Sequence, residues 1–228
     1  MIVYVDLEHD WLKKNRPATW EQTLARRLRV KYQLEQLCGD LCMIVRYLHL
    51  CPVLLRGLQA RIVVVSGCHT DFEHYSDESL AGLRAVYREA AWPVLALGGG
   101  FELMAQAYGS EIGPIGPLAT GEPDPYKGAY VPGMKQERGF MPVKIHTRHP
   151  LLDGLGQQPV FFQSHYWEVK SLAGGFLPLA ESQLSPVQAV AHAELPLYGV
   201  QFHPEDYDEL HPAGCRVLQN FLELGETS

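Results

Sequence analysis

The sequence predicts an α/β fold with a doubly wound, mostly parallel sheet flanked by helices. Short apolar segments rich in β-branched residues recur through the first half of the chain, and stretches with helical periodicity lie between them. Nearly continuous apolar strands are typical of sheets that are buried on both faces. Strands that alternate with helices indicate a parallel sheet, whose crossovers are right-handed.

The first half of the chain supplies four expected strands and the helices that connect them. The strands are expected at residues 1–7, 41–47, 61–67 and 93–98. The helices are expected at about residues 19–38, 51–59 and 78–91, and a further helix follows Gly98. Their alternation places one crossover helix between each pair of neighbouring strands in the sequence.

The helix expected at residues 19–38 contains the one locally basic stretch of the chain, LARRLRVK at residues 24–31. Apolar side chains recur at every fourth position, namely Trp20, Leu24, Leu28 and Tyr32. The basic side chains between them are Arg26, Arg27, Arg29 and Lys31. This pattern favours a solvated basic face opposite a buried apolar stripe. The alternative is that the basic residues form a docking patch for an acidic partner.

The pattern changes after residue 110. Residues 113–133 are rich in Gly and Pro and have no helical periodicity, which predicts a long surface loop. Short strands are then expected at residues 140–146, 159–165, 176–182, 187–193 and 197–203. A closing helix carries an apolar stripe of Cys215, Leu218, Phe221 and Leu222. No internal repeat is evident, so residues 1–228 are expected to form a single domain.

The composition narrows the classes of function. An apolar fraction of 46% and a charged fraction of 20% are ordinary for a globular protein. The net charge of −7 argues against nucleic acid as the main partner, and neither a signal peptide nor a membrane span is evident. Five irregularly spaced cysteines are expected to be reduced thiols in the cytoplasm, without a metal site or other cofactor.

The candidate functional residues follow three of the expected strands. Open α/β sheets bind ligands at the carboxyl ends of their strands. The strand at 61–67 leads into Ser66-Gly67-Cys68, and the strand at 93–98 leads into the glycine turn Gly98-Gly99-Gly100. The strand at 197–203 ends in His203-Pro204-Glu205. These three turns are therefore expected to lie together at one edge of the sheet.

These motifs together resemble the class I glutamine amidotransferases, the family with a Cys-His-Glu triad. GVQFHPE at 199–205 matches the family's motif for His and Glu without a gap, and QSHYWEV at 163–169 matches a ligand-side motif. The resemblance extends over about residues 60–224, and it implies a flavodoxin-like fold. It also implies a small-molecule ligand similar to an amino acid or a carboxylate, and a synthase partner chain that would receive ammonia.

The resemblance implies a mechanism from which one part is missing here. In the family a thiolate attacks the side-chain amide of glutamine, and the His acts first as base and then as acid. His203 would be that base and Glu205 would orient it. The nucleophile position aligns with Gly98, which has no side chain and relieves the backbone strain of the turn. Glu102 is a second departure, because the family usually has Gln at this position.

The resemblance also assigns residues that would bind the substrate. Gly67 and Cys68 would form the oxyanion-hole turn together with Gly99. Ser164 and His165 would lie where the α-amino and carboxylate ends of glutamine are read. Cys68 is the one thiol expected near the site. It is interpreted as a small residue in a tight turn, with a displaced nucleophile as the alternative.

Three functions remain open from the sequence. The first is an enzyme that binds a glutamine-like or γ-glutamyl ligand and uses His203 and Glu205, with a contribution from Glu102, for acid–base chemistry without a covalent intermediate. The second is a non-catalytic module that binds a ligand or a partner. The third is an ordinary glutaminase that carries an engineered Cys→Gly change at position 98; the departure at Glu102 argues against it.

Overall fold

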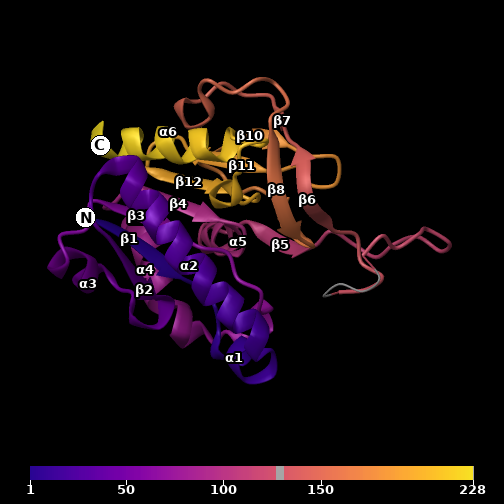
Figure 1. The fold of residues 1–228 in the computed structure, drawn as a ribbon, viewed down its shortest axis with the longest axis horizontal. Helices are drawn as coiled ribbons and strands as arrows, with labels where there is room; N and C mark the ends of the chain where they lie inside the picture. The colour runs from indigo at the N-terminus through magenta and orange to yellow at the C-terminus, as the bar shows by residue number, and fades with distance from the viewer. Residues whose placement is uncertain (127–130, 228) are drawn as a thin grey trace.

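The computed structural model describes residues 1–126 and 131–227, and its central feature is an eight-stranded sheet with the order β2-β1-β3-β4-β12-β11-β10-β7 (Figure 1). The strands are β1 (Ile2–Asp6), β2 (Cys42–Arg46), β3 (Ile62–Val65), β4 (Val94–Leu97), β7 (Lys144–Ile145), β10 (Phe176–Glu181), β11 (Ala189–His192) and β12 (Leu197–Val200). The first five strands in this order pair in parallel, and β11, β10 and β7 extend the sheet in antiparallel pairing. The predicted doubly wound, mostly parallel sheet is confirmed.

Helices cover both faces of this sheet. They are α1 (Asp10–Asn15), α2 (Pro17–Cys38), α3 (Pro52–Gly57), α4 (Asp77–Glu89), α5 (Gly99–Ala107) and α6 (Ala213–Thr227). Short 3-10 turns occur at Tyr47–His49, Phe72–His74, Pro150–Leu152 and Pro204–Asp206. Helices α2 and α6 lie on one face of the sheet, and α3, α4 and α5 lie on the other. No helix among the described residues is both long enough and apolar enough to cross a membrane.

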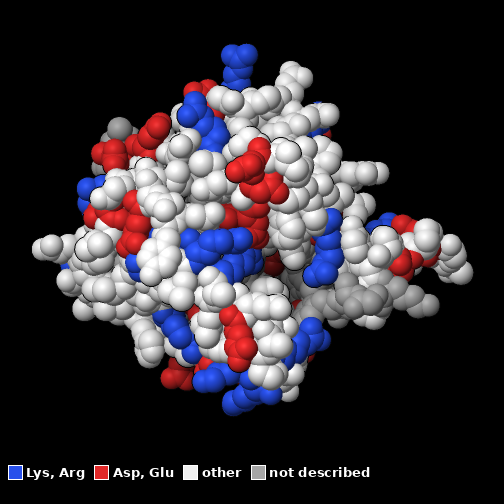
Figure 2. Space-filling view, in the orientation of Figure 1, with Lys and Arg blue, Asp and Glu red and all other residues white. Residues whose placement is uncertain are grey.

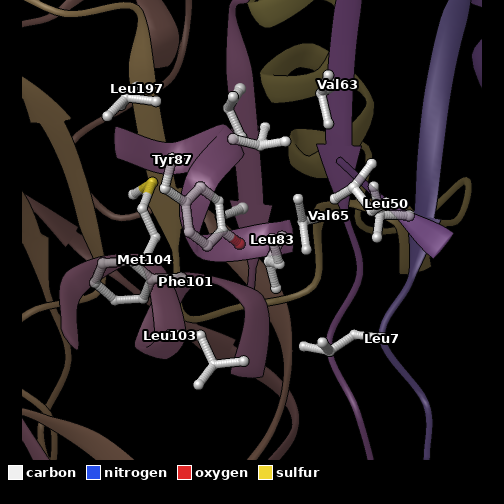
Figure 3. Close-up of a cluster of buried hydrophobic side chains, with 14 of the residues drawn as sticks. Leu7, Leu50, Val63, Val65, Leu83, Tyr87, Phe101, Leu103, Met104 and Leu197 are labelled. Carbon is white, nitrogen blue, oxygen red and sulfur yellow. The ribbon is translucent and has the colours of Figure 1, made fainter. Parts of the chain in front are cut away.

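The core consists of two apolar clusters, one on each face of the sheet. Because side chains alternate along a strand, Val63 and Val65 of β3 belong to one cluster, whereas Ile62 and Val64 belong to the other. Figure 3 shows the first cluster, in which Phe101 and Met104 of α5 pack close to Tyr87 of α4. Helix α5 is thereby fixed against the sheet directly after the glycine turn.

The orientation of α2 is the reverse of what the apolar stripe predicts. The side chains of Leu24, Leu28 and Tyr32 are 41%, 50% and 57% exposed. The buried face is formed by Thr23, Arg27, Val30 and Leu34. The helix crosses the carboxyl end of β1, where Asp6 provides a buried partner for Arg27, so a charge pair occupies a position at which an apolar contact was expected.

The structure contains elements that the sequence did not predict, most of them in the second half of the chain. Strand β5 (Glu111–Pro114) pairs with β9 (Trp167–Ser171), and β6 (Glu137–Pro142) pairs with β8 (Val160–His165). Strands β5 and β9 and helix α1 were not expected. The predicted loop at 113–133 is irregular after β5 over the residues that the structure describes; residues 127–130 of it lie outside them.

Candidate active site

One cavity brings the predicted site residues together at the carboxyl ends of β3, β4 and β12. Its wall includes Gly67, Cys68, Gly98, Gly99, Glu102, Ser164, His165 and His203. Glu205 is fully buried behind His203 rather than in the wall. These residues lie together at the carboxyl edge of the sheet, as the topology rule for open α/β sheets predicts.

The glycine turn has the backbone of a nucleophile elbow. Gly98 has φ +49° and ψ −119°, a conformation that ordinary residues adopt only with strain. An ideal Cβ at Gly98 would lie 3.2 Å from His203 Cε1 and 3.5 Å from His203 Nε2. Gly100 is needed for close packing, because a Cβ there would lie 2.8 Å from the Ser66 carbonyl oxygen. The turn thus retains the geometry that presents a side chain to His203, although residue 98 has none.

His203 is held by a carboxylate and an arginine. Its Nδ1 lies 3.0 Å from Glu205 Oε1, and Arg26 Nη2 of α2 donates to the same oxygen at 2.9 Å. Burial opposes ionisation of Glu205, but the nearby charges of His203 and Arg26 outweigh it and lower the pKa of Glu205 to about 2. Arg26 and Arg29 also pair with Asp206. These basic residues of α2 therefore have partners within the chain.

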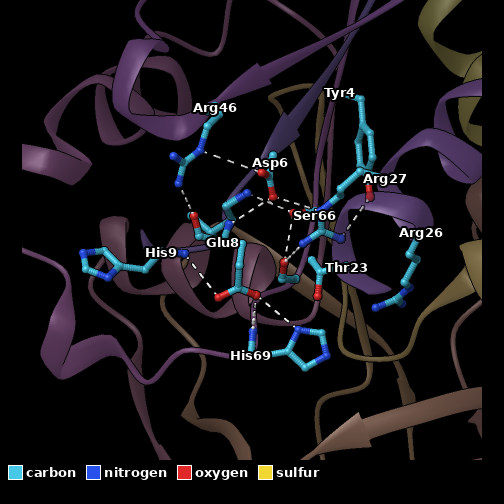
Figure 4. A network of polar contacts seen from close by, with 12 residues as sticks. Tyr4, Asp6, Glu8, His9, Thr23, Arg26, Arg27, Arg46, Ser66 and His69 are labelled. Atoms are coloured by element: carbon cyan, nitrogen blue, oxygen red, sulfur yellow. Dashed lines mark hydrogen bonds and ion pairs between the residues drawn. The ribbon is translucent and has the colours of Figure 1, made fainter. Parts of the chain in front are cut away.

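The turn after β3 is fixed by Arg27, the neighbour of Arg26 (Figure 4). Arg27 is fully buried; its Nη2 donates to the Gly67 carbonyl oxygen at 2.7 Å and its Nε to Asp6 Oδ1 at 2.9 Å. The Ser66 hydroxyl donates to the same Gly67 carbonyl at 2.9 Å. Two donors therefore hold this carbonyl toward the interior, which fixes the orientation of the peptide between Gly67 and Cys68.

Glu8 fixes the continuation of that turn. Its carboxylate is fully buried and accepts hydrogen bonds from the backbone N–H of His69 at 2.8 Å and from the Thr70 hydroxyl at 2.6 Å. Burial opposes ionisation, but the hydrogen bonds from His69 and Thr70 prevail and lower the pKa of Glu8 to about 2. The loop that forms one wall of the cavity is thus anchored from β1 and α2 (Figure 4).

Cys68 has the surroundings of a thiol rather than a thiolate. Burial raises the pKa of Cys68 well above its ordinary value, and the charge of Glu8 adds to this effect. Its Sγ lies 3.5 Å from the Thr70 carbonyl oxygen, which accepts the thiol hydrogen. These surroundings favour the interpretation as a small turn residue over that as a displaced nucleophile.

Glu102 forms a buried pair with Gln201. Gln201 Nε2 donates to Glu102 Oε1 at 2.8 Å, and both side chains line the cavity. Burial is the main influence on Glu102 and raises the pKa of its carboxyl group. Gln201 is fully buried, and its Oε1 accepts no hydrogen bond from a described residue. A buried amide oxygen without a donor is costly, so this oxygen offers a contact for an N–H group of a ligand.

Ser164 and His165 both line the cavity, but their side chains differ in availability. The Nδ1 of His165 lies 2.7 Å from the Trp167 carbonyl oxygen, and its Nε2 lies 3.1 Å from Glu137 Oε2. Both ring nitrogens thus have acceptors within the chain. The hydroxyl of Ser164 has no hydrogen bond to another described residue.

A metal is a poor fit to the one cluster of potential ligands identified among the described residues. His203, Glu205 and Asp206 have ligand atoms within 4.8 Å of one another. Arg26 and Arg29, however, already bind the two carboxylates. A cation would have to displace both arginines.

Several residues that build the site were not found from the sequence: Asp6, Glu8, Arg26, Arg27 and Gln201. A signal for the first two was present, because Asp6 lies near the end of the strand expected at 1–7 and Glu8 directly follows it, just as the predicted turns lie at the ends of the other strands. No pattern distinguished Arg26 or Arg27 from a solvated basic face. Gln201 lies inside the QFHPE motif itself, where only the His and the Glu were assigned roles.

The strand order, the elbow and the His–Glu pair together define an α/β protein of the glutamine amidotransferase type. The family model for glutamine amidotransferase class-I matches residues 47–224. The chain therefore belongs to the class I glutamine amidotransferase family.

Two relatives are similar in sequence, and each is named as one subunit of a glutamine-hydrolyzing GMP synthase. The chain is 33% identical over 138 residues to the protein from Pyrococcus furiosus, which covers 60% of this chain and 63% of the relative. It is 31% identical over 157 residues to the protein of the same name from Thermococcus kodakarensis, which covers 69% of this chain and 66% of that relative. The match to the first relative thus spans just under two thirds of that protein's length.

Solved structures show the same fold at low sequence identity. A crystal structure from Thermoplasma acidophilum, provisionally described as one subunit of a GMP synthase, has a TM-score of 0.73 at 20% identity and covers 100% of this chain and 94% of that one. A glutamine amidotransferase from Thermotoga maritima has a TM-score of 0.57 at 12% identity, covering 90% of this chain and 75% of the other. Both likenesses concern the fold alone.

Proposed function

We propose that the protein binds a glutamine-like or γ-glutamyl ligand at the glycine elbow, and that His203 acts on a water molecule rather than on a thiol. The observation that carries the proposal is the pairing of an oriented His203 with an elbow that has no side chain. His203 Nδ1 faces Glu205 at 3.0 Å, and its Nε2 lies 3.5 Å from the place where a Cβ of residue 98 would be. The base retains its orientation, and the nucleophile has to come from elsewhere.

The proposed reaction is hydrolysis of an amide in one addition and one elimination. His203 Nε2 takes a proton from water while the water oxygen adds to the amide carbonyl carbon. Backbone N–H groups at the start of α5 and in the Gly67–Cys68 turn stabilise the oxyanion. The C–N bond then breaks, and His203 returns the proton to the leaving nitrogen. The products are a carboxylate and an amine, and no covalent enzyme intermediate is formed.

Two further contacts support an amide-bearing ligand. Gln201 lines the same cavity, and its buried Oε1 has no donor among the described residues, so we propose that a bound ligand amide donates to it. Ser164 lines the cavity from β8 and offers a hydroxyl to the amino-acid end of the ligand. We propose this role for Ser164; His165 positions the strand, because its ring nitrogens already have acceptors.

The first experiment is a thermal-shift screen of amino acids, γ-glutamyl amides and small carboxylates. A ligand at 100 times its Kd is expected to stabilise the protein by about 2.7 kcal/mol. Hydrolysis of each stabilising amide is then followed as amine release with the wild-type chain, His203→Gln and Cys68→Ala. We expect release to be lost in His203→Gln and retained in Cys68→Ala. Loss in Cys68→Ala alone would instead assign the nucleophile to Cys68.

The second candidate is a non-catalytic module that binds a ligand or a partner chain. The exposed stripe of Leu24, Leu28 and Tyr32 on α2 favours it, because apolar side chains aligned on a helix surface are typical of contact sites. Two relatives are named as subunits of a synthase, so a synthase chain is the first partner to test by co-purification. Ligand binding without measurable amine release would favour this candidate. In either case we propose a cytoplasmic protein with reduced thiols.

A further inference from the structure

A second, larger cavity adjoins the candidate active site. Its volume is about 450 Å³, compared with about 70 Å³ for the inner cavity at the elbow. Five wall residues are common to the two cavities: Cys68, His69, Ser164, His165 and Tyr166. In Figure 2 a hollow opens between the α2 side of the molecule and the β6–β8 side, with basic side chains on both sides of it. A ligand larger than glutamine can therefore extend from the elbow into this outer cavity.

The two cavities differ in charge. The inner wall contains two carboxylates, Glu102 and Asp71. No carboxylate lines the outer cavity among the described residues, whereas Arg16 and Arg138 both do. The chain as a whole has 26 acidic and 19 basic residues, so a wall with two arginines and no acid is unlike the average surface.

The two arginines approach the outer cavity from different elements. Arg16 lies between α1 and α2, with its guanidinium 6.0 Å from the centre of the Trp11 ring, and Arg138 lies in β6. Thr19 and Gln136 add polar groups to the same wall. The acidic residues nearest the shared wall are already engaged, because Glu8 binds His69 and Glu137 binds His165. Among the described residues, the wall of the outer cavity therefore presents two cationic side chains and no carboxylate.

We propose that the outer cavity binds an anionic group, a carboxylate or a phosphate, on the part of the ligand that extends beyond its glutamine-sized portion. This inference rests on the proposed function, because the glutamine-sized portion has to occupy the elbow. Guanidinium groups bind both anions through paired N–H donors, and two of them on separate elements select a ligand of defined length. The favoured substrate class is a γ-glutamyl amide whose amine part carries a negative charge.

The experiment compares two ligands that differ in the distal charge. Calorimetric titration of the wild-type chain is made with γ-glutamylglycine, which carries a carboxylate beyond the amide, and with γ-N-methylglutamine, which does not. We expect γ-glutamylglycine to bind about 10-fold more tightly, with the difference shrinking as salt is raised from about 50 mM to about 200 mM. The phosphate ester of γ-glutamylethanolamine, titrated in parallel, distinguishes a phosphate site from a carboxylate site by its relative affinity.

Two variants and a matched control locate the effect. Arg138→Gln and Arg16→Gln should each reduce the preference for γ-glutamylglycine to less than about 3-fold and leave binding of γ-N-methylglutamine unchanged. Arg88→Gln, an exposed arginine on α4 outside both cavities, should change neither affinity. Thermal unfolding of each variant confirms that it is folded.

The outcomes separate this inference from the proposed function. If the wild-type chain binds the charged and neutral ligands equally, or if both cavity variants retain the preference, the anion site is wrong and the proposed function stands. If neither γ-glutamyl ligand nor glutamine binds the wild-type chain, the proposed function and the anion site are both wrong.

Discussion

Two adjacent arginines of helix α2 contact different parts of the candidate site. Arg27 binds the turn after β3 and Arg26 binds the partner of His203, and the two arginines differ in how deeply they are buried. At the turn after β3, Arg27 is fully buried and donates hydrogen bonds to Asp6 and to the Gly67 carbonyl. On the histidine side, the Arg26 side chain is 21% exposed and shares Glu205 with His203. Consecutive residues on a helix point about 100° apart, which lets one segment reach both turns.

This difference in burial indicates that Arg27 mainly stabilises the fold, whereas Arg26 mainly affects the properties of a site residue. A charge as deeply buried as Arg27 contributes to stability mainly because its removal would take away the close partner of Asp6 and leave only the longer contact to Arg46. Arg26 retains contact with solvent, so its removal is less costly, and its main effect is on the charge and orientation of Glu205. The turn after β3 is thus fixed by folding, whereas the histidine side is set by electrostatics.

The largest expected effect concerns Arg27. Arg27→Met should lower the free energy of unfolding by about 3–5 kcal/mol, because it leaves buried Asp6 with only the longer contact to Arg46 Nε at 3.9 Å and the Gly67 carbonyl without one of its donors. Urea unfolding followed by circular dichroism measures the loss. The control is Arg29→Met, whose side chain is 52% exposed, and its cost should stay below about 1 kcal/mol. Equal losses of unfolding free energy in Arg27→Met and Arg29→Met would contradict the conclusion that the buried arginine is the one that stabilises the fold.

The next effect is the pH dependence that Glu205 contributes. Because the folded state lowers the pKa of Glu205 to about 2, its contribution to stability is present above its unfolded pKa and is lost as pH falls toward 2. Between about pH 5 and about pH 2, wild type should lose about 2–3 kcal/mol more than Glu205→Gln.

Urea unfolding at several pH values measures this difference, and the comparison cancels the contribution of Glu8, which both proteins share and whose pKa is also lowered to about 2. Parallel curves for wild type and Glu205→Gln would show that the charges of His203 and Arg26 do not stabilise the Glu205 carboxylate.

The parallel half of the fold could be predicted because its signals are local. Each buried strand is a continuous apolar run, and β1, β2, β3 and β4 lie within the predicted ranges. The antiparallel additions were harder, since β5 contains Gly113 and Pro114, residues that weaken a strand signal. Strand β9 follows β8 after the single residue Tyr166, so the sequence shows no turn between them.

Only the site residues that belong to recognisable sequence motifs could be predicted. The elbow, His203 and Glu205 follow strand ends, and the topology of the sheet brings them together. The inward direction of Arg27 was not predictable, because a buried cation depends on Asp6, which is distant in sequence and adjacent only in the fold. Helical periodicity favoured the four-residue repeat of apolar residues, and a tertiary charge pair overrode it.

The smallest expected effect tests what remains of the elbow. Gly98→Cys introduces a thiol beside His203, but the new residue has to adopt φ +49°, at a cost of about 1–3 kcal/mol in stability. The variant should be a poor glutaminase, because Glu102 lies one helical turn away and its negative charge would raise the pKa of the new thiol. Glu102→Gln retains an amide oxygen for Gln201 and removes that charge.

The double variant Gly98→Cys with Glu102→Gln should therefore release ammonia from glutamine about 10-fold faster than Gly98→Cys alone, which corresponds to about one unit of thiol pKa. Burial raises the pKa of the Glu102 carboxyl group. Ammonia release from both variants is measured across pH 6 to 9. Equal rates for the two variants at every pH would mean that the charge of Glu102 does not affect a thiol at position 98. The absence of a thiol at this position would then be the chemical difference that matters at the glycine turn.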